Sequence, residues 1–169
     1  MAEQPSFRLN KIAHVCLVVK DIDKSMAAYY RDFGVGPWRL VTYGSADCAE
    51  GSTYRGQPGN FRMRFALTDV GGLTLEMVQT LQGPTIYDDH LKKCGESVHH
   101  MGIIVDELDK AVAEFAAMGF KPIMTARGWG KSHDGHFAYM GTEDALGVVY
   151  ELVKMPTVRF DPDGFYPPQ

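Results

Sequence analysis

The hydrophobic and polar positions of this chain follow one pattern twice. From His14 the sequence reads HVCLVVKDIDKSMAAYY, and from His100 it reads HMGIIVDELDKAVAEFA, an ungapped match at an offset of 86 residues. Each copy begins with an apolar strand, predicted over Ile12–Val19 and Val98–Val105, and continues through an acidic turn into an amphipathic helix. A self-match at a fixed offset is the signature of duplicated architecture. We therefore expect two related modules in one chain.

Three further strands are predicted in each module, which gives a βαβββ unit. They are Trp38–Tyr43, Phe61–Leu67 and Leu73–Gln79 in the first module, and Pro122–Ala126, His136–Met140 and Val148–Val153 in the second. A short helix over Ile86–Cys94 links the modules. Asp21 and Asp106 are expected to cap the two long helices, which then end at Gly34 and Gly119.

The chain divides into five parts on this reading. The boundaries are an N-terminal arm over 1–10, a first module over 11–80, a linker helix over 81–96, a second module over 97–154, and a C-terminal tail over 155–169. The tail contains Pro162, Pro167 and Pro168, which favour an irregular arm over a strand or helix.

One residue with metal-binding chemistry lies in each of four strands. Strand alternation puts Glu76 of LTLEMVQ and Glu151 of VVYELV among apolar neighbours, and His14 and His100 hold equivalent positions in the first strands. The alternatives are hydrogen-bonded histidines, and glutamates on the solvent face of a one-sided sheet. Burial of an unpaired carboxylate is costly, and a divalent cation would neutralise both carboxylates. The four residues together therefore predict a metal site, of the imidazole–carboxylate kind that suits catalysis better than structure. His99 is expected to face the opposite side of the strand, where it either packs or contacts a metal ligand from behind the site.

Composition excludes several partners. Apolar residues make up 45% and charged residues 22%, with a formal net charge of −4 and a pI near 5.8. No basic field indicates nucleic acid, no apolar run is long enough for a membrane span, and the N-terminus lacks the apolar centre of a signal peptide. We expect a cytoplasmic protein. The three cysteines lack CxxC spacing, and Cys16 is expected to be a small buried hydrophobe.

The module openings AHVCLVVKDIDKSMAAYYRDFGV and HHMGIIVDELDKAVAEFAAMGF, with TLEMVQ and VYELV closing each half, resemble the vicinal oxygen chelate superfamily of glyoxalases, bleomycin resistance proteins and dioxygenases. The resemblance covers about Lys11 to Lys154 and is closest to the methylmalonyl-CoA epimerase-like branch. It implies an α+β fold in which two tandem βαβββ modules form one curved, mostly antiparallel, cup-shaped sheet with helices outside. It also implies one divalent metal ion (Co, Ni, Zn, Mn or Fe) held by four ligands: His14, Glu76, His100 and Glu151.

The implied activity is that of an epimerase or isomerase. In such an enzyme a proton is abstracted next to a carbonyl and the metal stabilises the resulting enolate. Extradiol dioxygenases, which resemble this duplication, leave the Glu76 position unliganded. Epimerases carry a further glutamate before the LxLE strand, and the matching segment TYRGQPGNFRMRFAL has no acidic residue. We therefore expect a relative of these epimerases with a different small-molecule substrate, of the acyl-CoA or 2-oxo/hydroxy acid type. A glyoxalase-type lyase and a metal-chelated ligand-binding or resistance protein are the alternatives.

Further residues are candidates for catalysis and substrate binding. Glu151 can act as the base if it loosens from the metal, and His136 and Tyr54 lie in or beside loops that can reach the mouth of the cup. Arg55, Arg64 and Trp129 are the predicted substrate-binding residues. The alternatives are solvated loop residues, the outer face of a strand for Arg64, and the core or an interface for Trp129. The glycine-rich segment around His133 can act as a lid, and the alternative is a solvated surface loop. The apolar tail RFDPDGFYPP indicates a homodimer contact.

Overall fold

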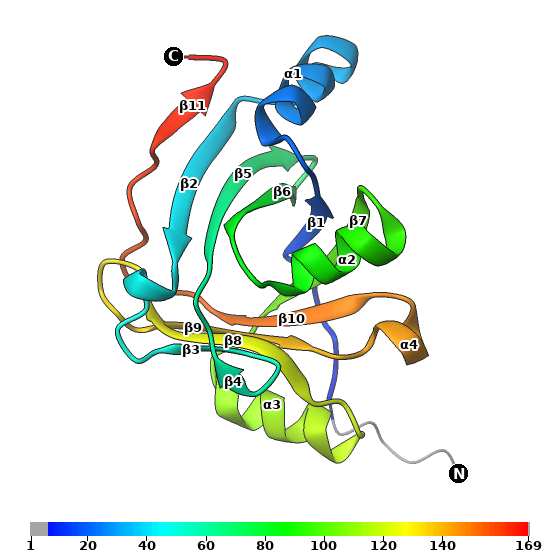
Figure 1. Cartoon of the computed structure of the whole chain (residues 1–169), viewed down its shortest axis with the longest axis vertical. Coiled ribbons are helices and arrows are strands. Elements are labelled where there is room, and N and C mark those ends of the chain that lie inside the picture. The colour runs from blue at the N-terminus through cyan, green and yellow to red at the C-terminus, as the bar shows by residue number, and fades with distance from the viewer. Residues whose placement is uncertain (1–6, 169) are drawn as a thin grey trace.

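The computed structural model of this protein describes residues 7–168 and shows a single curved sheet with the long helix of each module on its outside (Figure 1). The linker helix lies on the inner side, where Ile86 and Tyr87 join the core inside the sheet. The elements of the first module are β1 (His14–Val18), α1 (Ile22–Phe33), β2 (Trp38–Gly44), β5 (Arg62–Val70) and β6 (Leu73–Gln82). Those of the second module are β7 (Ser97–Ile104), α3 (Leu108–Ala117), β8 (Pro122–Trp129), β9 (Gly135–Met140) and β10 (Val149–Lys154).

Shorter elements complete the chain. The linker helix is α2 (Ile86–Cys94), as predicted, and a 3-10 turn covers Ser45–Asp47. The rest are β3 (Ser52–Tyr54), β4 (Gln57–Pro58), α4 (Glu143–Leu146) and β11 (Gly164–Tyr166).

The strand order mirrors the sequence duplication. The sheet runs β11-β2-β5-β6-β1-β7-β10-β9-β8-β3-β4, so the two modules meet at the antiparallel pair β1 and β7. Within each module the first and last strands pair in parallel, β1 with β6 and β7 with β10, and the other pairings are antiparallel. Figure 1 shows α1 and α3 at opposite ends of the molecule, outside the sheet. The predicted α+β fold is therefore confirmed.

Each module edge is extended by a segment from elsewhere in the chain. β3 follows β2 in sequence but pairs with β8 of the second module, and β11 at the C-terminus pairs with β2 of the first. The prediction that the tail is an irregular arm is therefore wrong over Gly164–Tyr166. The backbone of these three residues pairs with an edge strand, and Pro162, Pro167 and Pro168 all lie outside the paired stretch.

Alternation along the strands separates an inner core from two outer cores. The side chains of Phe65, Val78 and Tyr139 pack inside the cup. Alternate residues face the helices: Trp38 packs beneath α1 and Leu152 beneath α3. Side chains of a functional site inside the cup therefore have to come from the inward-facing positions of the strands.

The helix ends follow the predicted signals in part. The Asp21 carboxylate accepts the backbone N–H of Lys24, and Gly34 ends α1 in the left-handed region at φ 66°. Asp106 is not the cap of α3, because the helix begins one residue later and the N-cap position falls on Glu107. The repeat itself points to this position, because Asp21 and Glu107 are 86 residues apart.

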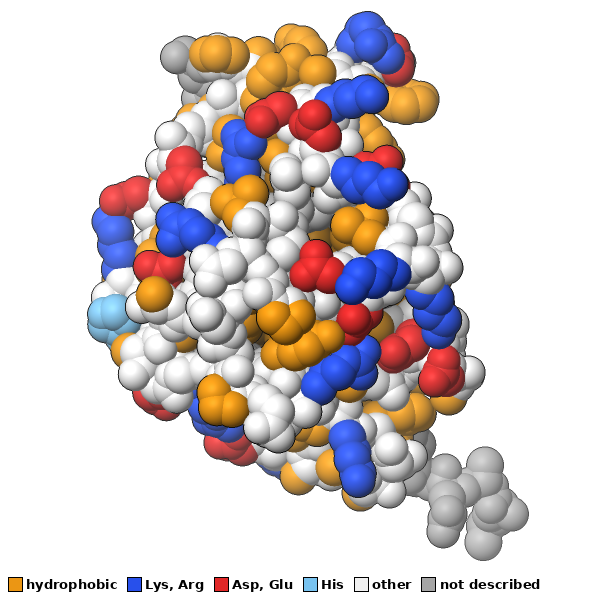
Figure 2. Space-filling view, viewed as in Figure 1, with side chains coloured by type: hydrophobic (Ala, Val, Ile, Leu, Met, Phe, Trp, Pro, Cys, Tyr) orange, Lys and Arg blue, Asp and Glu red, His pale blue; other side chains and the backbone are white. Residues whose placement is uncertain are grey.

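The surface carries both signs of charge. On the face drawn in Figure 2, acidic and basic side chains of the described residues are interspersed, with apolar side chains between them. Among the helices of residues 7–168, none is both long and apolar enough to cross a membrane.

Candidate active site

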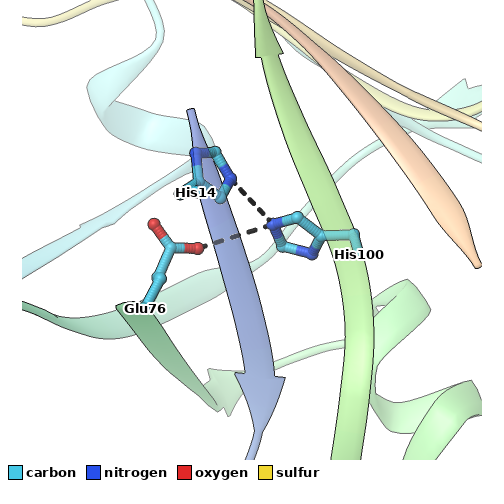
Figure 3. A group of neighbouring side chains, drawn as sticks. All are labelled: His14, Glu76 and His100. Carbon is cyan, nitrogen blue, oxygen red and sulfur yellow. Dashed lines mark hydrogen bonds and ion pairs between the residues drawn. The ribbon is translucent and has the colours of Figure 1, made fainter. Parts of the chain in front are cut away.

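Three of the four predicted ligands form a tight cluster on the inner face of the sheet. Nε2 of His100 lies 3.2 Å from Nε2 of His14 and 3.6 Å from Oε1 of Glu76 (Figure 3). One potential ligand atom from each residue lies within 4.8 Å of the others. The cluster is assembled where β6, β1 and β7 run side by side, so the junction of the modules places it.

Glu151 of β10 completes the set from the other side. Its Oε2 lies 2.8 Å from Nε2 of His14 and 3.5 Å from Nε2 of His100. Both glutamates are buried, Glu76 at 7% and Glu151 at 5% exposure. The alternative of solvent-facing glutamates is therefore excluded.

A glycine makes room for the first histidine. His14 pairs directly with Gly102 of β7, and a Cβ atom at Gly102 would lie 1.9 Å from Cε1 of His14. The imidazole thus occupies the space of the missing side chain. The repeat-related pair joins His100 to Cys16, another small residue. A small residue two positions after each histidine is a signal that the sequence carries and that sequence reasoning missed.

The charges of the cluster compensate one another. Burial lowers the pKa of His14, but the carboxylates of Glu76 and Glu151 outweigh burial and raise it to about 9. Burial alone would raise the pKa of Glu76, yet His14 and His100 lower it overall. In the metal-free protein a protonated His14 therefore places one positive charge between the two buried carboxylates.

This donor set fits a divalent transition metal ion. Nitrogen and oxygen ligands bind such ions at about 2.0–2.2 Å, which places neighbouring ligand atoms about 3–4 Å apart. The separations of 2.8–3.6 Å between the donor atoms match that spacing. Two imidazoles and two carboxylates give a neutral complex with a doubly charged cation.

A β-bulge changes the predicted place of His99. β7 pairs Cys16 with His100 and the next residue, Leu17, with Val98, so His99 is the extra residue. Its Nδ1 lies 3.0 Å from Nδ1 of His100, and its ring packs against Tyr87. The prediction of opposite faces is therefore wrong, although His99 does pack as expected. Burial, followed by the neighbouring His100, lowers the pKa of His99 to about 2, so its ring stays neutral.

The cluster forms the floor of a small pocket of about 110 Å³. Its wall is largely aromatic and aliphatic. Tyr43 stacks between Phe65 and Trp129, with ring centroids 4.9 and 5.9 Å apart, and Phe160 packs on Tyr43 at 5.7 Å. Trp129 thus lies at the pocket as predicted. Burial raises the pKa of Tyr43 well above its usual value, so its hydroxyl keeps its proton.

Two predicted catalytic side chains are not brought to this pocket. The Tyr54 hydroxyl donates to Asp89 of α2 at 2.8 Å. His136 alternates with the inward-facing Phe137 and lies on the outer face of β9, where its Nδ1 accepts the backbone N–H of Gly128. These contacts hold both side chains away from the cluster, and neither lines the pocket.

Two predicted substrate-binding arginines also lie elsewhere. Arg55 donates to Asp89 of α2. Arg64 forms a bidentate pair with Asp23 of α1, at 2.6 and 3.0 Å, on the outer face of β5. The alternative reading of Arg64 as an outer-face residue therefore holds.

The loop around His133 holds the C-terminal tail. Asp134 accepts the backbone N–H of Thr157 at 2.9 Å, and the backbone N–H of Lys131 donates to the carbonyl of Val158 at 2.9 Å. The tail then crosses to the first module, where the N–H of Asp163 donates to the carbonyl of Leu40. The segment that covers the pocket is therefore the tail, with Phe160 in its middle, and the predicted lid is its anchor.

Two basic pocket residues were missed by sequence reasoning. Arg39 and Arg159 both line the pocket. Arg39 alternates with Val41 and Tyr43 along β2, a pattern that could have placed it on the inner face. Arg159 belongs to the tail, and no local pattern marks it.

Two βαβββ modules that share one sheet define the class of this protein. The chain matches the Glyoxalase/Bleomycin resistance protein/Dioxygenase superfamily over residues 13–153. It belongs to this superfamily, which confirms the resemblance seen in the sequence.

Solved structures share the fold at low sequence identity. A hypothetical protein from Bacillus halodurans C-125 aligns with a TM-score of 0.64 and 17% identity, over 89% of this chain and 98% of that one. A methylmalonyl-CoA epimerase from Mycobacterium tuberculosis aligns with 0.63 and 19%, over 91% and 94%. The Streptomyces coelicolor epimerase in complex with 2-nitronate-propionyl-CoA aligns with 0.61 and 20%, over 90% and 99%. Among curated protein sequences, none matches this chain.

Proposed function

We propose that this protein is a divalent-metal-dependent epimerase or isomerase that removes a proton next to a carbonyl. The substrate is of the acyl-CoA or 2-oxo/hydroxy acid type. The observation that carries the proposal is the convergence of two histidines and two buried glutamates at the floor of an apolar pocket. His14, Glu76, His100 and Glu151 would hold the ion.

A bound divalent ion would supply Lewis-acid stabilisation of the negative charge that develops on a carbonyl oxygen. The protein supplies the rest. The aromatic wall of Tyr43, Phe65 and Trp129 excludes water, which strengthens electrostatic interactions inside the pocket. The neutral Tyr43 hydroxyl can orient a polar substrate atom as a hydrogen-bond donor.

Glu151 is the proposed base. Its carboxylate lines the pocket beside His14, and it is one of only two carboxylates that do so among the described residues. The other is Glu76, which comes from the opposite module. A proton taken up by Glu151 can return to either face of a planar intermediate once the substrate turns in the pocket, which gives epimerisation.

Isotope exchange tests the proposal. Metal-loaded protein in D2O is incubated with methylmalonyl-CoA and, separately, with 2-oxobutanoate, and NMR follows loss of the proton next to the carbonyl. We expect exchange with at least one substrate and a loss of about 10²-fold or more in Glu151→Gln at saturating metal. Glu107→Gln, at the exposed N-cap position of α3, is the matched control. Metal binding without exchange of either substrate would favour a ligand-binding protein and overturn the proposed activity.

A further inference from the structure

Arg39 and Arg159 differ from most arginines of this chain. Five of the eight arginines form an ion pair with an aspartate: Arg31, Arg55, Arg62, Arg64 and Arg127. Within residues 7–168, neither Arg39 nor Arg159 has such a partner, and both line the pocket.

The sheet register places Arg39 in line with the metal ligands. Arg39 pairs with Leu67 of β5, and Leu67 pairs with Glu76 of β6. These three side chains share the inner face, and adjacent strands are about 4.8 Å apart. The Cα atoms of Arg39 and Glu76 are therefore about 10 Å apart, two strand spacings. A small molecule can contact both side chains at once.

The tail adds the second guanidinium. Thr157 is bound to Asp134 of the second module and Asp163 to Leu40 of the first, and Arg159 lies between these anchors. The chain path thus carries Arg159 across the mouth of the pocket to the side where Arg39 lies.

Two guanidinium groups close together repel each other. Burial, followed by the charge of Arg159, lowers the pKa of Arg39. The nearby carboxylate that acts on Arg39 is Glu76, which belongs to the ligand cluster. The pair therefore has the charge and the partial burial that favour binding of an anion.

We propose that Arg39 and Arg159 bind a carboxylate at the end of the substrate remote from the four-residue cluster, so that the substrate is a small 2-oxo or 2-hydroxy dicarboxylate. This inference rests on the proposed function. A planar guanidinium matches a carboxylate in bidentate geometry. The 2-oxo or 2-hydroxy acid group is the part that would face the metal ligands.

Pocket size favours a small acid over coenzyme A. The volume of about 110 Å³ is well below the roughly 300–1,000 Å³ of pockets that enclose drug-sized ligands. Phe160 of the anchored tail also narrows the pocket, because its ring packs against Tyr43 and Trp129, with centroids 5.7 and 6.4 Å apart.

Matched pairs of acids test the inference. Calorimetry on protein loaded with Mn²⁺ compares 2-oxoglutarate with 2-oxopentanoate, and 2-oxoadipate with 2-oxohexanoate. Each pair differs only in the distal carboxylate. We expect one diacid to bind at least 10-fold more tightly than its monoacid, and the preference to fall below threefold in Arg39→Gln and in Arg159→Gln. Arg64→Gln removes an equal charge from the outer face and should keep the full preference.

Several outcomes would overturn the inference. They are equal binding of acid and diacid at both chain lengths by the wild type, an unchanged preference in Arg39→Gln, and coenzyme A binding with the same arginine dependence. Failure of the proposed function gives a different result, in which Mn²⁺ or the monoacids do not bind. In dialysed, metal-free protein the arginine-dependent preference for a diacid should persist as a difference in thermal stabilisation.

Discussion

Protonation of His14 should control the stability of the metal-free protein. In the fold, its pKa of about 9 lies well above the ordinary 6.5, because Glu76 and Glu151 outweigh the effect of burial. A group whose pKa is raised by folding adds stability that is fully present below its unfolded pKa. That stability is lost as pH rises through the folded pKa. The sensitive window is therefore pH 6.5 to 9.

The size of the effect follows from the shift. One pKa unit corresponds to about 1.36 kcal/mol, so the free energy of unfolding should fall by about 3 kcal/mol across the window. For a chain of this size that is about 6–12 °C in melting temperature. The side chain of His14 is only 15% exposed, so solvent screens the interaction little.

Urea unfolding followed by tryptophan fluorescence, at steps from pH 6 to 9.5 in chelator-treated protein, measures this loss. His14→Gln should remove the step. His136→Gln is the matched control, because burial lowers the pKa of His136 outside the cluster, and its removal should leave the step in place. Parallel curves for wild type and His14→Gln over the whole range would refute the reasoning.

Two substitutions and one labelling experiment test the site and its support. Gly102→Ala should displace the His14 imidazole and weaken Zn²⁺ binding at least about tenfold by calorimetry, whereas unchanged affinity would mean that the ring adapts. His99→Phe should cost about 10–100-fold in Zn²⁺ affinity, because the Nδ1 contact that orients His100 is lost, and retained affinity would assign His99 to packing alone. Ellman's reagent at pH 8 should label one thiol in the folded chain, Cys94, and three after unfolding. Cys16 and Cys48 are buried, and burial raises the pKa of both thiols. Early labelling of a second thiol would contradict that burial.

Short-range patterns were enough to predict that these four side chains come together. Alternation put Glu76 and Glu151 on the apolar face of their strands, and the ungapped repeat matched His14 to His100. Strand pairing then brings equivalent positions together at the module junction, because β1 and β7 are neighbours. Each of these inferences needs only period-two geometry and the duplication.

Features that depend on distant partners could not be predicted in this way. The bulge at His99 arises from pairing with β1, and β7 alone gives no sign of it. Tyr54 and Arg55 lie beside a glycine-rich loop, but Asp89, more than thirty residues away, holds both. Sequence reasoning assigned such side chains to the nearest site, whereas the fold paired them with an aspartate on another element.

The duplicated and unduplicated parts of the chain have different tasks. The four donors come from repeat-related strands, so the cluster inherits the near symmetry of the two modules. Arg159 and Phe160 come from the tail, which lacks an equivalent in the other half, and Arg39 comes from β2, whose counterpart β8 contributes no arginine to the pocket. The edges differ as well, since β11 covers β2 whereas β3 covers β8. Substitutions at the mouth of the pocket can thus change the substrate while the four donors of the cluster stay the same. The repeat therefore places the four candidate ligands, and the substrate has to be inferred from the residues that break the repeat.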